Sequence, residues 1–156
     1  MPVEETEFRL AMGHFACGVT VVTTAVDGER FGLTVASFAS LSLRPPLVLV
    51  CIDKSVRTHD AILRAGKFAV NVLAADQEAV SRTFASRVDD KFAAVEVIEG
   101  AHGLPLIGGS LATMECSLQD QLPGGDHTIF VGLVETSSVS TADPLVYFRS
   151  GYRKLV

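Results

Sequence analysis

Basic clusters and cysteine motifs are both missing from this sequence of 156 residues. Lysine and arginine total 13 against 18 aspartate and glutamate residues, which gives a formal net charge of −5 without any basic cluster. Because nucleic-acid-binding proteins carry basic patches, we expect no DNA or RNA partner. The three cysteines (Cys17, Cys51 and Cys116) are far apart, form no C-x-x-C pair and have no histidine placed to complete a zinc site. We interpret them as reduced core thiols of a cytoplasmic protein.

Long apolar runs and a basic leader are absent as well. The first seven residues are acidic where a secretory signal would be basic, and no apolar run approaches the roughly 20 residues of a membrane span. No linker or repeat divides the chain, so residues 1–156 are expected to form one domain that is neither secreted nor membrane-spanning. A hydrophobic content of 48% is high for a small monomer and favours an oligomer with a buried interface.

The common catalytic and nucleotide-binding motifs are missing too. No G-x-G-x-x-G follows a strand, and neither a Walker loop nor a G-x-S-x-G elbow occurs. The four histidines show no pairing with a nucleophile and no metal-ligand spacing, and the acidic residues are scattered. A chain without reactive groups of its own indicates a bound cofactor that carries the chemistry.

Short apolar segments separated by turn residues make up most of the chain. Alternation and β-branched residues predict strands over 19–24, 31–37, 47–52, 68–73, 113–118, 127–134 and 144–148. Helical spacing predicts short helices from Glu7, over 58–65 with Gly66 as its stop, and after Asp76, which is placed as an N-cap. Asp27 and Gly28 predict a tight hairpin turn, and the prolines of 44–46 predict an extended entry to the strand 47–52. Within 113–118, Glu115 falls on a face expected to meet water. The pattern predicts a mainly β protein, an antiparallel barrel with short helices over its ends.

One segment, residues 32–46, combines an apolar strand pattern with a row of hydroxyl side chains. The hydroxyls belong to Thr34, Ser37, Ser40 and Ser42. A hydroxyl buried without a partner costs on the order of 1–3 kcal/mol, and the row directly precedes the core strand 47–52, so a polar partner is expected. These groups and nearby backbone N–H groups would suit a phosphate and a polyol chain, with Lys54 and Arg57 adding positive charge. The alternative is that the serines cap turns and both cations are solvated.

Two further features are candidate ligand contacts. His127 stands at the mouth of a hairpin beside Gly124 and Gly125, where its ring can donate a hydrogen bond or stack on a planar ligand. The alternative is a half-exposed histidine paired with Asp126 or with backbone. The basic and aromatic stretch 149–153 can receive the phosphate and ring of a dinucleotide, or it is a solvated C-terminus.

Five segments, spread from about Phe8 to Tyr152, carry a family resemblance. They are 18–23, 32–46, 68–73, 125–127 and 147–152. Taken in order, they resemble the short-chain flavin reductases, the reductase components of two-component flavin monooxygenases. The resemblance implies a flavin-binding split β-barrel, antiparallel and Greek-key-like, that acts as a homodimer. It also implies that NADH or NADPH reduces FMN or FAD and that a separate monooxygenase receives the reduced flavin.

The same resemblance implies a set of contacts. The isoalloxazine and ribityl chain would lie against one strand end and the turn after it: Thr34, Val35, Ala36, Ser37 and Phe38, with Ser40 and Ser42 close by. The next strand end and helix start would surround the flavin phosphate: Cys51, Ile52, Asp53, Lys54, Arg57 and Thr58. A later helix would close the site with Phe84 and Ala85. His127 would face the nicotinamide, and the dinucleotide site would be completed by Arg149, Gly151 and Tyr152.

The sequence therefore predicts an NAD(P)H:flavin oxidoreductase. No protein acid or base is required, and backbone N–H groups around residues 35–37 would stabilise charge developing on the flavin. Two other functions stay open. One is a protein that binds flavin tightly as a sensor, store or oxidase-like relative and does not react with NAD(P)H; the other is a dimeric scaffold without activity.

Overall fold

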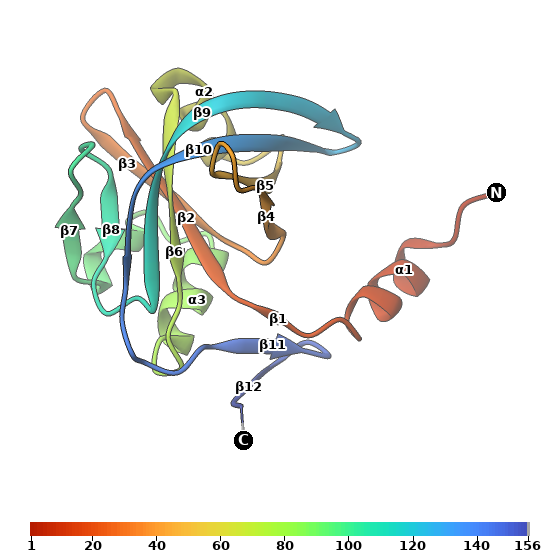
Figure 1. Cartoon of the computed structure of the whole chain (residues 1–156). Coiled ribbons are helices and arrows are strands. Elements are labelled where there is room, and N and C mark those ends of the chain that lie inside the picture. Colours follow the sequence, from red (N-terminus) through yellow and green to blue (C-terminus); the bar gives the residue numbers. More distant parts are fainter. Residues whose placement is uncertain (156) are drawn as a thin grey trace.

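The computed structural model describes residues 1–155 and consists mainly of antiparallel strands (Figure 1). Its strands are β1 (Cys17–Gly18), β2 (Thr20–Val26), β3 (Glu29–Val35), β4 (Phe38–Ser42), β5 (Leu47–Asp53), β6 (Lys67–Val72), β7 (Val97–Glu99), β8 (Pro105–Ile107), β9 (Ala112–Gly124), β10 (His127–Val139), β11 (Val146–Phe148) and β12 (Gly151–Arg153). Its helices are α1 (Glu5–Met12), α2 (Arg57–Ala65), α3 (Glu78–Ala85) and the short 3-10 helix η1 (Lys91–Ala94). The predicted fold class, mainly β with short helices, is confirmed.

Seven strands form one sheet in the order β3-β2-β6-β9-β10-β5-β4, with every neighbouring pair antiparallel. The sheet's two edge strands, β3 and β4, are consecutive in the chain, and β3 also contacts β5. The sheet therefore curls until its edges meet, which gives a barrel that is split between β3 and β4. The small sheet β1-β11-β12 lies beside it (Figure 1).

Two clusters of buried apolar side chains pack the helices against the barrel and fill its interior. The first fills the barrel with buried side chains such as Val50, Phe68 and Phe130, and α2 adds Ile62 to it. The second packs α3 against the sheet and includes Val21, Leu73, Phe84 and Phe92. Helix α2 ends where Gly66 adopts φ 68° and its N–H donates to Ile62 O, so the predicted glycine stop is confirmed.

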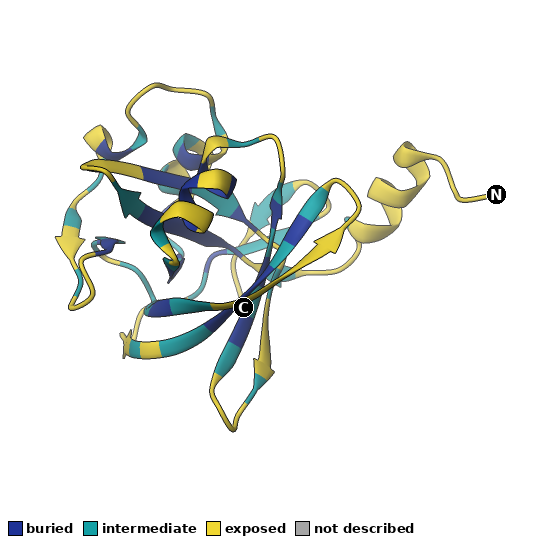
Figure 2. Ribbon diagram, turned by 90° about the horizontal axis from the view of Figure 1, so that it is seen from above, coloured by how far each residue is buried: buried dark blue, intermediate teal, exposed yellow. Residues whose placement is uncertain are grey.

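Helix α1 projects away from the barrel as an arm, and Figure 2 shows it exposed along its whole length. None of its residues is buried, although Phe8, Leu10 and Met12 are apolar and 49%, 68% and 54% exposed. A helix of eight residues is too short to be stable alone in water, so it needs a packing partner. Among residues 1–155, no helix has the length and apolar character that crossing a membrane requires.

The strand predictions hold in outline, but several ends differ. Strands β9 and β10 each run for 13 residues, longer than predicted. The strand predicted over 31–37 ends at Val35, and residues 43–46 form a turn between β4 and β5 rather than an extended lead-in. The segment 149–153 is not a solvated tail, because Gly151–Arg153 pairs with β11 as β12. Antiparallel pairing, a long-range contact, decided the lengths of β9 and β10 and the inclusion of β12.

Glu115 corrects the prediction of a water-facing side of β9. It is 3% exposed, and its carboxylate accepts hydrogen bonds from His102 N (2.9 Å) and Thr136 Oγ1 (3.0 Å). The connection between β7 and β8 covers this face, so the polar side chain is paired inside the protein instead of hydrated. Alternation located the residue on the correct face and could not show that a distant loop covers it.

The predicted N-cap of helix α3 is also wrong. The helix begins at Glu78 after Gln77, and Asp76 is exposed and makes no cap. Gln77 instead fixes the turn, because its Oε1 accepts from Ala74 N (2.9 Å) and its Nε2 donates to Gly108 O (2.9 Å). A buried amide with both ends bonded therefore replaces the expected carboxylate cap.

The three thiols are expected to differ strongly in reactivity. All three are free; Cys116 is 2% exposed, and burial, with Glu115 and Glu135 nearby, raises the pKa of its thiol to about 12. At pH 8 its thiolate fraction is then about a thousandfold below that of a free cysteine. Labelling with a thiol-reactive dye should therefore modify Cys116 only after unfolding in guanidinium. Rapid reaction of all three thiols in the folded protein would contradict this.

Candidate functional site

The split of the barrel leaves a short stretch of backbone open to solvent between β3 and β4. Ala36 and Ser37 are exposed there, and their N–H groups donate no hydrogen bond within residues 1–155. The turn is held against β5, because the Ser37 hydroxyl donates to Cys51 O (2.9 Å) and Cys51 N donates to Ser37 O (3.1 Å). The split therefore presents two fixed and unused N–H donors, which can bind ligand oxygen atoms.

The hydroxyl side chains of the segment 32–46 do not require a ligand as their polar partner. Thr34 Oγ1 donates to Ser81 O (2.6 Å), Ser37 bonds to β5, and Ser40 and Ser42 are exposed and half-buried on the edge strand β4. Within residues 1–155, no buried side-chain nitrogen or oxygen lacks a partner. No unsatisfied buried hydroxyl therefore indicates a ligand in this segment. The open backbone beside the hydroxyls is the feature that offers binding groups.

The end of β5 forms a fixed turn. The Asp53 carboxylate accepts hydrogen bonds from Ser55 N and Ser55 Oγ, both at 2.8 Å. These bonds, with smaller contributions from His127 and His59, hold the pKa of Asp53 below its usual value. Asp53 therefore stays ionised and keeps the turn in one conformation. Lys54 follows it directly, is exposed, and forms no ion pair within residues 1–155.

Helix α2 starts beside this turn, and its first two residues, Arg57 and Thr58, differ in how far they are available to bind an anion. The Arg57 guanidinium pairs with Glu29 and lies 5.2 Å from the centroid of the Phe31 ring, so its charge is already partnered. Thr58 is 5% exposed. Because the first N–H groups of a helix have no intrahelical partner, this helix start and Lys54 are the groups available to an anion here.

His127 begins β10 and lies opposite Asp53 in the strand register. Its Nδ1 is 2.7 Å from Asp126 Oδ1, its side chain is 41% exposed, and Asp126 O accepts from Lys54 N at 3.0 Å. The contacts are those of the half-exposed, Asp126-paired histidine considered above. They leave its Nε2 without a hydrogen bond within residues 1–155 and free for a ligand. Strand β5 thus lies between Ser37 on one side and His127 on the other.

Helix α3 connects the C-terminal strand to β3. Ser81 Oγ is 2.6 Å from Tyr152 OH, the Ser81 carbonyl accepts from Thr34, and Arg82 Cζ lies 4.9 Å from the centroid of the Tyr152 ring. Sequence reasoning missed Ser81. The only sequence feature that could have indicated Ser81 is its spacing: it lies three residues before Phe84 and so shares the buried face of the helix.

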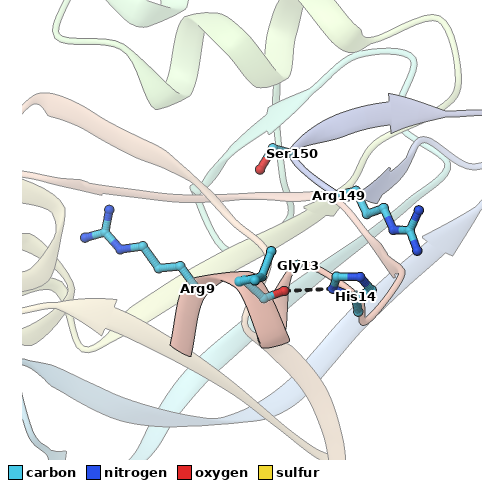
Figure 3. A pocket seen from close by; sticks show the side chains of 6 residues that line it. Arg9, Gly13, His14, Arg149 and Ser150 are labelled. Carbon is cyan, nitrogen blue, oxygen red and sulfur yellow. Dashed lines mark hydrogen bonds between the residues drawn. The ribbon is translucent and has the colours of Figure 1, made fainter. Parts of the chain in front are cut away.

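Arg149 lies on the same hairpin as Tyr152 and makes different contacts. It forms the turn between β11 and β12 with Ser150, and both have left-handed backbone, with φ values of 49° and 58°. Arg149 N donates to Gly13 O (2.8 Å), and the turn and α1 enclose a recess of about 460 Å³ (Figure 3). Figure 3 shows the guanidinium groups of Arg149 and Arg9 pointing away from each other. Arg149 and Tyr152 therefore belong to one hairpin and make different contacts, Arg149 with the end of α1 and Tyr152 with α3.

Some of the residues predicted to contact the flavin have side chains that are buried in the protein core. The side chains of Val35, Ile52 and Phe84 are at most 5% exposed and belong to the two apolar clusters. Phe38 is half-buried against the barrel cluster, whereas Ala85 is exposed at the end of α3 and Gly151 is half-buried in β12. The fully buried groups can support a ligand site through packing, and only their backbone atoms can touch the ligand.

The candidate site thus consists of the free N–H groups at the barrel split, the start of helix α2 and His127 at the start of β10. The sequence profile of the flavin reductase like domain matches residues 12–156. The chain belongs to this flavin reductase family. The match covers far more than half of the chain, so it includes all three sheets of the described residues, the split and the C-terminal strand.

Characterised members of the flavin reductase family are similar over nearly the whole chain. The reductase component of 4-nitrophenol 4-monooxygenase/4-nitrocatechol 2-monooxygenase from Rhodococcus opacus is 43% identical over 99% of this chain and 83% of that protein. The flavin reductase (NADH) of Kitasatospora aureofaciens is 41% identical over 97% of this chain and 82% of its own. The NADH:FAD oxidoreductase of Streptomyces globisporus, solved with NAD and FAD fragments, superposes with a TM-score of 0.95 at 38% identity, covering 98% of this chain and 93% of that one.

The donor set at the split fits a flavin. The isoalloxazine ring carries carbonyl oxygens and a ring nitrogen that accept hydrogen bonds, and the free N–H groups of Ala36 and Ser37 supply donors for them. Lys54 and the start of α2 supply charge and N–H groups suited to a flavin phosphate. These groups flank the C-terminal half of β5, so one elongated ligand can reach both sets.

Proposed function

We propose that this flavin reductase uses NADH to reduce FMN or FAD and passes the reduced flavin to a separate monooxygenase. The observation that carries the proposal is the open pair of N–H groups at Ala36 and Ser37, on the other side of β5 from His127. The relatives named as NADH-dependent reductases and as a monooxygenase reductase component support it. The free thiols of the described chain agree with a reducing, cytoplasmic location.

The chain's residues would contribute binding, orientation and electrostatics. A bound flavin supplies the group that accepts hydride, so the protein need not transfer a proton itself. The N–H groups of Ala36 and Ser37 would stabilise negative charge that develops at the ring's polar edge. Lys54 and the start of α2 would hold the phosphate. His127, oriented by Asp126, would place the nicotinamide through its free Nε2.

The decisive experiment is a matrix of steady-state rates for the purified protein with FMN or FAD against NADH or NADPH. We expect oxidation of NADH that depends on added flavin. If nicotinamide oxidation is absent in all four combinations, the proposal is wrong. A yellow protein that keeps its flavin through dialysis but does not oxidise NADH would instead favour the tightly flavin-binding alternative.

His127→Ala should lower kcat/KM for NADH about tenfold, the effect of losing one ligand hydrogen bond of roughly 1.4 kcal/mol. Flavin affinity should change less than twofold, because Ala36, Ser37 and Lys54 are untouched. His102→Ala is the matched control, since His102 is exposed on the connection between β7 and β8. Steady-state kinetics at saturating flavin test this. Equal kcat/KM values for the wild type and His127→Ala would remove His127 from the nicotinamide site.

We further propose that the protein is a homodimer in which α1 packs against the second copy. No residue of the arm is buried, and Leu41 in β4 and Leu43 in the following turn are 50% and 80% exposed. Exposed apolar groups gathered on protruding elements are typical of interfaces. The double variant Phe8→Glu/Leu10→Glu should halve the mass measured by light scattering, whereas Ile98→Glu on β7 should not. An unchanged mass would exclude α1 from the interface.

A further inference from the structure

A second recess, of about 240 Å³, lies between helix α2 and the outer half of the β9–β10 hairpin. Its lining consists of Lys54, His59, Leu63, Gln121, Leu122, Pro123 and Thr128. Lys54 directly follows β5, and its N–H donates to Asp126 O at the tip of that hairpin (3.0 Å). The recess therefore adjoins the strand end where the flavin phosphate is proposed to lie.

The buried polar groups of this recess are fully engaged with each other. His59 Nε2 lies 2.7 Å from Thr128 Oγ1, and its Nδ1 lies 2.9 Å from Asp60 Oδ1. His59 and Thr128 are 8% and 9% exposed, and the imidazole packs at 5.2 Å against the Phe130 ring. Because both ring nitrogens are bonded within the chain, this part of the recess is a rigid wall and needs no ligand atom to satisfy it.

The groups that remain for a ligand are apolar walls, one amide and one cation. Leu63 and Leu122 are 39% and 44% exposed, large values for leucines facing a recess, and Pro123 lies beside them. The side-chain amide of Gln121 makes no hydrogen bond within residues 1–155. Lys54 likewise has no acidic partner there. Apolar walls suit a flat ring, a side-chain amide pairs with the edge of adenine, and an ammonium group attracts phosphate.

We propose that this recess binds the adenine of FAD while Lys54 contacts the diphosphate, so that the chain binds FAD more tightly than FMN. The inference rests on the proposed flavin site, because the adenine reaches the recess only if the flavin phosphate lies beside Lys54. A volume of about 240 Å³ is below the 300–1,000 Å³ of pockets that enclose a whole drug-sized ligand, so it suits one base at the end of a longer molecule.

The test compares FAD and FMN binding by titration calorimetry in the wild type and two wall variants. Leu63→Glu places a charged side chain on the apolar wall where the adenine ring would pack, and Gln121→Ala removes the amide. The wild type should bind FAD at least tenfold more tightly than FMN. Each variant should remove most of that difference and weaken FMN binding less than twofold. Ile98→Glu, an exposed apolar position on the separate β7–β8 hairpin, should change neither affinity.

Adenosine serves as a second probe, because it carries the adenine but neither a phosphate nor a flavin ring. It should compete with FAD for the wild type and leave FMN binding largely unchanged at the same concentration. Equal wild-type affinities for FAD and FMN, or a parallel loss of both in Leu63→Glu and Gln121→Ala, would overturn the adenine site. Failure of the wild type to bind either flavin would instead refute the proposed function, so the two failures are distinguishable.

Discussion

Replacing Ser37 with leucine is expected to raise the dissociation constants of both FMN and FAD about 30-fold, equivalent to about 2 kcal/mol. Ser37 is exposed at the barrel split, and its N–H is one of the two unused donors there. A leucine side chain would occupy the space in front of Ala36 and would lose the hydroxyl bond to Cys51 O that fixes the turn. Flavin titration measures the change.

The fold should survive this substitution, because no buried contact depends on the Ser37 side chain. Thermal unfolding should therefore shift little, since exposed substitutions usually change stability by less than about 0.5 kcal/mol. Ser138→Leu, at an exposed position of β10 that pairs with Thr113, is the matched control and should leave flavin affinity unchanged. If Ser37→Leu binds flavin as the wild type does, the split is not the flavin site.

Phe130→Ala is expected to produce the largest loss of stability, about 3–5 kcal/mol in the free energy of unfolding. The Phe130 side chain is fully buried in the barrel, where it shares one cluster with Val50 and Phe68 and packs against His59 of α2. Truncation leaves a cavity that the closed sheet cannot collapse to fill. The melting temperature should fall by roughly 6–20 °C for a domain of this size.

Urea unfolding at one fixed protein concentration tests this value, since dimer formation would make stability depend on concentration. Ile98→Ala is a suitable control, because Ile98 is 49% exposed and its truncation should cost little. A Phe130→Ala protein within 1 kcal/mol of the wild type would show that the barrel interior is packed less tightly than its burial indicates.

The sequence identified most of the fold because the strand signals are local. Alternation and β-branched residues located the main strands, Gly66 marked the end of α2, and Asp27 and Gly28 marked the first hairpin turn. The split form of the barrel was implied by the family resemblance, and the pairing order of its strands came only from the structure, since period-two patterns say which face a residue occupies and not which strand lies beside it. Glu115 shows the limit, because the loop that buries it is more than ten residues away in the chain.

By itself, the sequence determined the strand-rich class, the absence of basic clusters and catalytic motifs, and the segment 32–46 as the place to look for a ligand. Only the tertiary structure showed that the hydroxyls there are bonded or exposed, and that the free groups are the N–H donors of Ala36 and Ser37. It also joined Tyr152 to Thr34 through Ser81 and bonded Arg149 to Gly13. The physical reason is that composition and spacing describe one segment at a time, whereas a free donor or a buried carboxylate depends on which distant strand or loop packs beside it.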